Sequence, residues 1–484
     1  MNRSTRTQAW STPPRAVRQP PSILTRSAAA MERPLELVWD PLRVLLFALT
    51  LITISRVHQN YPVLVTLRPA LVLVVGSIVY AYLNPRYLTR TNIFRAWPMR
   101  SVAILGVLAC CSAAFGISLG ASALFILGSY GKTLAFAFLI ALSIRHGRDL
   151  YMFVWAYVIS CGILSFFAIF VFGMSKQTNS FVTRLNDLYM YDSNDIGVVL
   201  MVGLPLTLLL LTADRGRKRV LLLAILIGIA TTMARSGSRG GFLGFVAVGL
   251  GVLVVVKTVS AAQRLIVVVV ASITLAVSAP PGYWQQMGTI LSPKEDYNYY
   301  DIDGRKAVVE RGLHYIAEYP AFGLGINNFS RAECSISPKL EFLRRGGPMR
   351  CTAPHNSYVE AGSELGIPGL LVWVSLTLGG IFAPGMLRRR LPKAWLRGTP
   401  PQRFVYNATS FFTVSMIAFA VTSFFVSFAW MDPLYFMAAL LTGLYVAAQT
   451  EFDAAYRSGG VVTSEPSPRR LAGWRMGRRV MPVS

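Results

Sequence analysis

Long apolar stretches, separated by short polar or basic segments, constrain this chain more than any other feature. A helix that crosses a bilayer needs about 20 mostly apolar residues, and sometimes fewer. Only 14% of the residues are charged, against about 25% in soluble domains. The sequence therefore predicts an all-α polytopic membrane protein with about twelve transmembrane helices, at residues 42–57, 69–83, 101–119, 124–144, 150–173, 194–213, 219–234, 241–256, 265–279, 363–386, 404–429 and 433–450.

Basic residues are concentrated in the two tails and in short loops. The formal net charge is +25, and arginines crowd residues 1–40 and 451–484, which we expect to be cytoplasmic tails, the first of them disordered. Such placement follows the positive-inside rule and attracts anionic lipid headgroups. No nucleic-acid recognition module is visible, so we expect membrane lipids as partners and no nucleic acid. Residues 1–30 lack the apolar core of a signal peptide, so the first span is predicted to be an uncleaved anchor.

Alternating the spans from a cytoplasmic N-terminus tests this topology. It places on the cytoplasmic side the basic loops at 86–100, 145–148, 215–219, 257–264 and 388–403, as the positive-inside rule requires. The predicted organisation then has about nine helices in a first transmembrane block, one extracytoplasmic loop, and about three helices in a second block, at 41–279, 280–355 and 356–450.

The extracytoplasmic loop is predicted to contain one short helix that begins at Arg305. Val308, Gly312 and Ile316 share one helical face with Val309. Pro320 ends this pattern, and a glycine-rich turn follows it.

The five cysteines show no metal-ligand spacing, and we predict no metal site. Cys110, Cys111 and Cys161 lie in apolar spans and are interpreted as packing residues. Cys334 and Cys351 lie in the polar loop, where they either form a disulfide in an oxidising compartment or remain free thiols.

Two arginines stand on the predicted outer side, against the positive-inside tendency. Arg239 lies in the turn Ser236–Phe242 between two spans, and Arg305 begins the loop helix. A guanidinium offers a planar fork that suits phosphate oxygens. The simpler interpretations are an interfacial side chain for Arg239 and a solvated helix for Arg305.

His355 follows Pro354 at the predicted membrane boundary. An imidazole titrates near neutrality and accepts a proton from a hydroxyl, although a lone histidine is more often structural. Glu360 and Glu364 lie one helical turn apart, and they either orient the imidazole or cap and solvate the helix end.

Two acidic clusters lie in polar segments. Asp301-Ile302-Asp303 superficially matches the triplet that binds metals and nucleotide-sugar diphosphates, but nucleotide sugars are cytoplasmic and this loop is predicted to be outside. A second cluster contains Asp187 and Asp192–Asp195, beside Arg184. Helix capping is the simpler role for Asp192–Asp195.

Three external segments, in this order, resemble the O-antigen ligase and O-antigen polymerase superfamily of bacterial envelope glycan assembly. Ser238-Arg239-Gly240-Gly241 is similar to the family's turn before an apolar span. Gly304-Arg305, followed by Phe322-Gly323-Leu324-Gly325, resembles its loop-helix signature. The third segment, which resembles the family's His-Asn-x-Tyr and Glu-x-Gly stretches, comprises His355-Asn356-Ser357-Tyr358 and Glu364-Leu365-Gly366. One departure lies in the loop helix: Val309, four residues after Arg305, stands where the family often has an aromatic residue.

The resemblance implies a class C-like inverting glycosyltransferase that needs neither metal nor cofactor and acts at the outer face of the bacterial inner membrane. The donor would be a glycan on undecaprenyl diphosphate, and the acceptor a hydroxyl of a lipid or saccharide. By position, Arg239 and Arg305 would hold the diphosphate, and His355 would activate or position the acceptor. Further substrate contacts would come from Arg184, Asn356, Tyr358 and Glu364.

Ligase and polymerase activities share all these residues, so the alternative between them stays open. The single loop of moderate length favours a ligase-like enzyme. A transporter or flippase is the rival from another class. Transporters tend to have internal repeats and ionisable residues at mid-membrane, whereas this chain shows no repeat and places its distinctive charges at the predicted outer surface.

Overall fold

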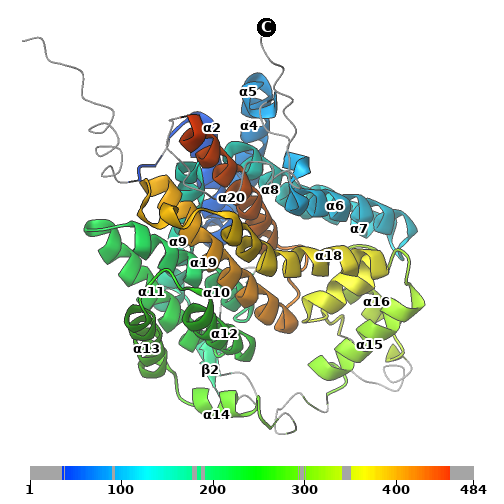
Figure 1. Ribbon diagram of the computed structural model, residues 1–484. Helices are drawn as coiled ribbons and strands as arrows, with labels where there is room; N and C mark the ends of the chain where they lie inside the picture. Colours follow the sequence, from blue (N-terminus) through cyan, green and yellow to red (C-terminus); the bar gives the residue numbers. More distant parts are fainter. Residues whose placement is uncertain are drawn as a thin grey trace, which may run out of the picture.

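The computed structural model describes residues 35–37, 39–89, 93–176, 182–186, 191–292, 294, 299, 301–340 and 350–457. Within these ranges the chain is almost entirely helical (Figure 1). The one sheet that they contain is an antiparallel pair, β1 (Met174–Lys176) and β2 (Thr183–Leu185). Most of the two predicted tails lies outside the described residues, as does Asp187.

Ten helical segments of the described chain are long and apolar enough to cross a membrane. They are Pro62–Leu83 (α3, Pro62–Leu67, and α4, Pro69–Leu83), Trp97–Phe115 (α6), Leu119–Ser143 (α7, Leu119–Phe125, η3, Ile126–Tyr130, and α8, Gly131–Ser143), Gly147–Phe170 (α9), Asp195–Ala213 (α10), Arg217–Ser236 (α11), Ala261–Ser278 (α13), Ser357–Arg390 (α18), Pro400–Phe425 (α19, Pro400–Thr422, and η6, Ser423–Phe425) and Asp432–Tyr456 (part of α20, Asp432–Arg457).

Two shorter apolar helices, α2 (Pro41–Ser55) and α12 (Arg239–Val255), occupy the remaining predicted spans. The all-α polytopic class is therefore confirmed, while twelve crossings stay a prediction. Short helical turns connect the spans: η1 (Val57–Asn60), α5 (Arg86–Thr89), η2 (Ile93–Arg95) and η5 (Lys393–Arg397).

The centre of the bundle is formed by α10 and α20, which are mostly buried, whereas α4 and α13 bury few residues. Helix α10 packs against α9, α11, α12 and α19, and α19 also packs against α12 and α18. Small residues allow the closest approach. A Cβ on Gly240 would lie 2.5 Å from the Cβ of Phe425, and one on Gly244 would lie 2.4 Å from Thr422. These glycines bring the N-terminal end of α12 against the end of α19 and η6.

The polar region between α13 and α18 contains α14 (Tyr283–Gly288), α15 (Arg305–Glu318) and α16 (Phe329–Ser335). Figure 1 shows α14, β2 and α15 towards one end of the bundle and α5 at the opposite end. Helix α15 confirms the predicted loop helix. It buries Val308 and Gly312 as expected, and also Tyr315, in a small core that includes Phe329 and Val359 of α18.

Helix α18 is interrupted at Gly366, which has φ 71° and ψ −174°. An interruption of a helix leaves backbone amides and carbonyls that need other hydrogen-bond partners. The loop supplies them: the amides of Leu324 and Gly325 donate to the carbonyls of Ser363 and Glu364 at 2.8 and 3.1 Å, and the amide of Ile367 donates to Pro320. The first part of α18 is therefore fixed to the loop.

Candidate functional site

Arg239 is placed by a tight turn between α11 and α12. Gly237 ends α11 with φ 58°, in the left-handed region that glycine adopts without steric cost. The Ser238 side chain caps α12 by accepting from the amide of Gly241 at 3.1 Å. Arg239 is therefore the first residue of α12, and its Nη1 donates to Thr289 Oγ1 at 2.9 Å. Thr289 directly follows α14, so this bond joins α14 to the turn.

Arg184, on β2, supports the same turn. Its Nε donates to the Ser236 carbonyl at 3.1 Å, and its Nη2 donates to Ser193 Oγ and to Asn194 Oδ1. These contacts join the Arg239 turn to the segment that precedes α10. They account for Arg184 as a scaffold residue, and its predicted substrate contact stays a prediction.

The acidic residues before α10 form the predicted cap. Asp192 Oδ1 accepts from the amides of Asn194 and Asp195 at 2.6 and 2.8 Å, and Asp195 Oδ2 accepts from the amide of Asp192. The capping interpretation is thus confirmed. Asp192 also lies close enough to His355 to affect its ionisation electrostatically.

His355 lies in the turn just before α18, with φ 48° in the left-handed region. Its backbone amide donates to Ser427 Oγ at 2.9 Å. Burial lowers the pKa of the imidazole, the positive charge of Arg305 lowers it further, and Asp192 raises it; the net pKa lies below the ordinary value of 6.5. His355 is therefore mainly neutral at neutral pH, the form that can accept a proton.

Arg305 begins α15 and lies within electrostatic range of His355. The positive charge of Arg305 therefore acts on His355, although much of the loop separates the two residues in the sequence. Arg239 is connected to His355 through a third segment of the chain, which contains Phe425 and Ser427. Gly240 packs against Phe425, and His355 is hydrogen-bonded to Ser427, two residues farther along.

The segment from Phe425, the last residue of η6, to Ala429 is the scaffold that sequence reasoning missed. Ser357 Oγ donates to the carbonyl of Val426 at 2.8 Å and accepts from the amide of Phe428 at 2.9 Å. Glu360 Oε2 accepts from the amide of Ala429 at 2.9 Å. The sequence places these residues at the end of the predicted span 404–429, but the helix ends at Phe425. The segment is apolar and carries no charge, so no sequence signal marks it.

Two of the predicted substrate-binding residues, Asn356 and Tyr358, make contacts within the fold. Asn356 caps α18 by accepting from the amides of Tyr358 and Val359 at 3.0 and 3.1 Å. Tyr358 donates to the carbonyl of Ala420 at 3.0 Å and stacks on Phe424. These contacts explain both residues structurally, and their roles towards a substrate stay predictions.

Glu364 is buried and accepts three hydrogen bonds. They come from the amide of Asn327 at 2.6 Å, the amide of Phe329 at 3.1 Å and the indole of Trp430 at 2.7 Å. Both carboxylate oxygens are used. Glu364 thus ties the loop to α18 and to the segment before α20, and this explains its position without a ligand.

An apolar groove lies beside the N-terminal half of α12. Its volume is about 510 Å³, within the range of about 300–1,000 Å³ that is typical of ligand pockets. It faces the surface, where Val246, Leu250 and Phe424 are exposed. Phe425, one of its lining residues, packs against Gly240, the neighbour of Arg239. The complete lining is Leu243, Val246, Ala247, Leu250, Val421, Phe424 and Phe425.

The acidic triplet at 301–303 is used within the loop. Asp301 Oδ1 accepts from the amide of Asp303 at 2.9 Å, and the carboxylate of Asp303 pairs with Lys339 at 2.8 Å. In the part of the chain that the structure describes, no three His, Cys, Asp or Glu side chains are grouped to hold a metal ion. Cys334 and Cys351 form a disulfide, which answers the question that the sequence left open.

The family comparison covers the region that holds this site. Residues 223–374 match the sequence model of the family described as O-antigen ligase. A comparison with curated proteins gave no match. The matched range runs from α11 into α18 and contains Arg239, Arg305 and His355. Residues 223–374 therefore form a domain of the O-antigen ligase family, which supports the resemblance to the O-antigen ligase and polymerase superfamily.

Proposed function

We propose that this protein transfers a glycan from an undecaprenyl-diphosphate-linked donor to an acceptor hydroxyl, at the outer face of the bacterial inner membrane. The family supports glycan transfer in general. The choice of donor is supported by the groove beside α12, which offers an apolar surface for a polyprenyl chain. One of its lining residues, Phe425, packs against Gly240, the neighbour of Arg239, whose guanidinium suits phosphate oxygens.

The reaction is a single displacement at the anomeric carbon of the donor. His355 accepts the proton of the acceptor hydroxyl, and the acceptor oxygen forms a bond to that carbon. The bond from the carbon to the diphosphate oxygen breaks, and undecaprenyl diphosphate leaves with the electron pair. Because the nucleophile attacks from the side opposite the leaving group, the anomeric configuration inverts. The imidazolium then returns its proton to water.

Arg239 and Arg305 are assigned to the leaving group. The diphosphate gains negative charge as the glycosidic bond breaks, and preorganised cations stabilise that charge. No group has to make a covalent intermediate, so the protein supplies orientation, anion stabilisation and proton removal.

The observation that carries this proposal is the electrostatic influence of Arg305, the first residue of α15, on the buried His355. A base beside a permanent cation has a lowered pKa and is neutral when the substrate arrives. The same cation is placed to meet an anionic leaving group. A structural histidine would not require the charge of Arg305 nearby.

Deleting the gene and examining the surface glycans tests the proposed function. Loss of attached polymer, with lipid-linked polymer accumulating, is the result expected of a ligase. Single repeat units on the acceptor would instead identify a polymerase, the alternative that shares every site residue. An unchanged glycan profile would refute both.

The outer location has an independent test. In intact cells a membrane-impermeant thiol reagent should label Cys334 and Cys351 only after reduction of their disulfide. Labelling that requires access from the cytoplasm would overturn the proposed orientation.

A further inference from the structure

We propose that a buried loop ion cluster, formed by Asp303, Arg311, Glu333 and Lys339, sets the separation between Arg305 and His355. This inference rests on the proposed function, because it makes these four residues positioning residues for that reaction. They touch neither the imidazole of His355 nor, by assignment, the substrate.

Glu333 on α16 is the centre of the loop ion cluster and is fully buried. Arg311 on α15 binds both of its carboxylate oxygens through Nε, at 3.0 and 3.1 Å, and donates from Nη2 at 2.7 Å. Tyr315, one turn later, donates its hydroxyl to the same carboxylate at 3.1 Å. These bonds fix the rotation of α15, the helix that begins at Arg305.

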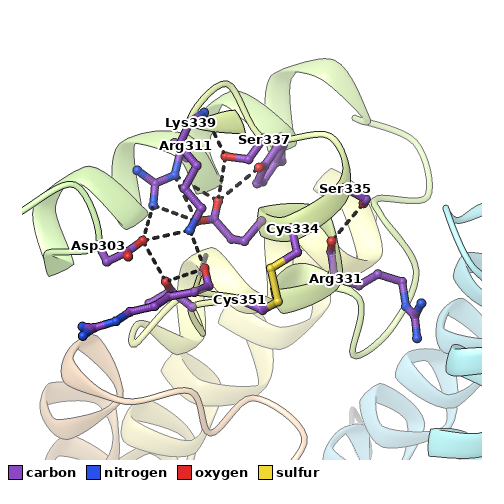
Figure 2. The surroundings of a disulfide bond; sticks show 12 residues. Asp303, Arg311, Arg331, Cys334, Ser335, Ser337, Lys339 and Cys351 are labelled. Carbon is purple, nitrogen blue, oxygen red and sulfur yellow. Dashed lines mark hydrogen bonds and ion pairs between the residues drawn. A yellow bond between two sulfur atoms is a disulfide. The ribbon is translucent and has the colours of Figure 1, made fainter. Parts of the chain in front are cut away.

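Lys339 connects the segment before α15 to the segment before α18 (Figure 2). Its Nζ lies 2.8 Å from Asp303 Oδ1 and 3.0 Å from Glu333 Oε2, and it donates to the carbonyl of Arg350 at 2.7 Å. Thr352 Oγ1 donates to Asp303 Oδ1 at 3.1 Å. One lysine therefore holds both the segment before α15 and the segment before α18.

The loop ion cluster is anchored close in sequence to both Arg305 and His355. Asp303 precedes Arg305 by two residues, and Thr352 precedes His355 by three. The disulfide Cys334–Cys351 repeats the connection, because Cys334 follows Glu333 and Cys351 lies between Arg350 and Thr352. Figure 2 shows the disulfide beside the cluster. Both reactive groups thus extend from short segments that are anchored to one point.

The charges of the loop ion cluster balance, with two cations and two carboxylates. Burial alone would raise the pKa of Asp303, but the hydrogen bond and charge of Lys339, with Thr352 and Arg311, lower it below its ordinary value. The carboxylate therefore stays ionised at neutral pH. A buried charge that loses its partner is strongly unfavourable, so the cluster holds one arrangement of the loop.

The test uses Lys339→Met in the purified full-length protein, with transfer measured over a range of pH and divided by the amount of folded protein. A misplacement of about 1 Å costs up to about 100-fold in rate, and we expect a loss of about tenfold or more. The acid limb of the pH profile should move to higher pH. His355 faces the charges of Arg305 and Asp192, and retraction of Arg305 raises its pKa.

Controls separate positioning from stability. Lys294→Met removes an exposed lysine from the same polar region, and it should keep both the rate and the pH profile. Thr352→Val removes one hydrogen bond to Asp303 without removing a charge. It should cause a smaller shift in the same direction, and it decides the question if Lys339→Met does not fold.

Two different results would count against two different ideas. If Arg305→Ala and His355→Asn remain active, the proposed function of the site is wrong. If those variants are inactive while folded Lys339→Met and Thr352→Val keep the normal rate and pH profile, the loop ion cluster only stabilises the fold, and this inference is wrong.

Discussion

The centre of the membrane bundle and the polar region around α15 are held together in opposite ways. Helix α10 is buried by apolar side chains from α9, α11, α12 and α19. The loop has only a small apolar core and depends on the buried carboxylate of Glu333, its cationic partners and one disulfide.

This difference determines how each region responds to substitution. Dispersion and apolar burial are distributed over many contacts, so a core helix tolerates a change of shape that keeps its volume. Ionic contacts in a buried site are few and directional, and removal of one partner leaves another uncompensated. We therefore expect the geometry of the reactive groups to be the more fragile property of this protein.

The largest effect should come from a substitution that disturbs neither the apolar packing of the bundle nor the ionic contacts of the loop. His355→Asn removes the base but keeps a residue type that tolerates the left-handed conformation at φ 48°. Transfer should fall by about 10²- to 10⁴-fold, the usual contribution of a general base, while the amount of folded protein stays normal. Glycan transfer per folded molecule is the measurement.

His314→Asn is the matched control for that substitution. His314 lies on α15, and its side chain is largely exposed beside Glu318. This variant should transfer normally. Equal losses in the two histidine variants would show that the effect is not specific to the proposed base.

Glu333→Gln and Leu200→Met compare the two regions directly. Glu333→Gln removes one of the two carboxylates that face Arg311 and Lys339, so that two cations face only Asp303, and should destabilise the loop by about 3–5 kcal/mol. Leu200, which is fully buried in α10, is replaced by a residue of similar volume at a cost of less than about 1.5 kcal/mol. Hydrogen exchange of α15 and α10 measures both. A larger effect at α10 would reverse the comparison.

Removal of the disulfide should have an intermediate effect that is confined to the loop. Replacing Cys334 and Cys351 together with Ala opens a connection between residues 17 positions apart, worth about 3 kcal/mol for a loop of about 15 residues. Faster proteolysis between α15 and α18 is the expected result. The double replacement of Cys110 and Cys111, which lie in α6 and are unpaired, should leave that rate unchanged.

The smallest effect should come from Thr289→Val, which sharpens the comparison at the membrane surface. The substitution removes the hydrogen bond from Arg239 to Thr289. Because Arg239 is only partly buried, water replaces part of the loss, and we expect about 0.5–1.5 kcal/mol, which is about a two- to tenfold weaker donor affinity. Thr274→Val, on an exposed face of α13, is the control. If Thr289→Val leaves the donor affinity unchanged, the hydrogen bond between Arg239 and Thr289 only holds α14 in place and does not orient Arg239 for the donor.

Local patterns predicted much of the bundle because hydropathy acts residue by residue. The apolar spans, the cap formed by Asp192 and Asp195, and the α15 helix that ends before Pro320 all follow from short-range rules. The family resemblance identified His355, Arg239 and Arg305 as candidates.

The remaining features depend on partners that are distant in the sequence. Ser427 has no local mark that would reveal its bond to the amide of His355. Glu364 reads as an exposed helix-end residue, yet it binds amides of the loop 35 and 37 positions away. Pairing of Cys334 with Cys351 likewise follows from tertiary geometry. Such contacts are set by how the loop docks, which no local pattern encodes.

The break in α18 has a consequence for how this protein is assembled. The carbonyls of Ser363 and Glu364 and the amide of Ile367 obtain their partners from Pro320, Leu324 and Gly325. Open backbone groups are not tolerated against lipid, so this helix reaches its final form only together with the folded loop. Completion of α18 is therefore coupled to folding of the loop. If the loop is misfolded, the backbone groups beside Gly366 lack these hydrogen-bond partners.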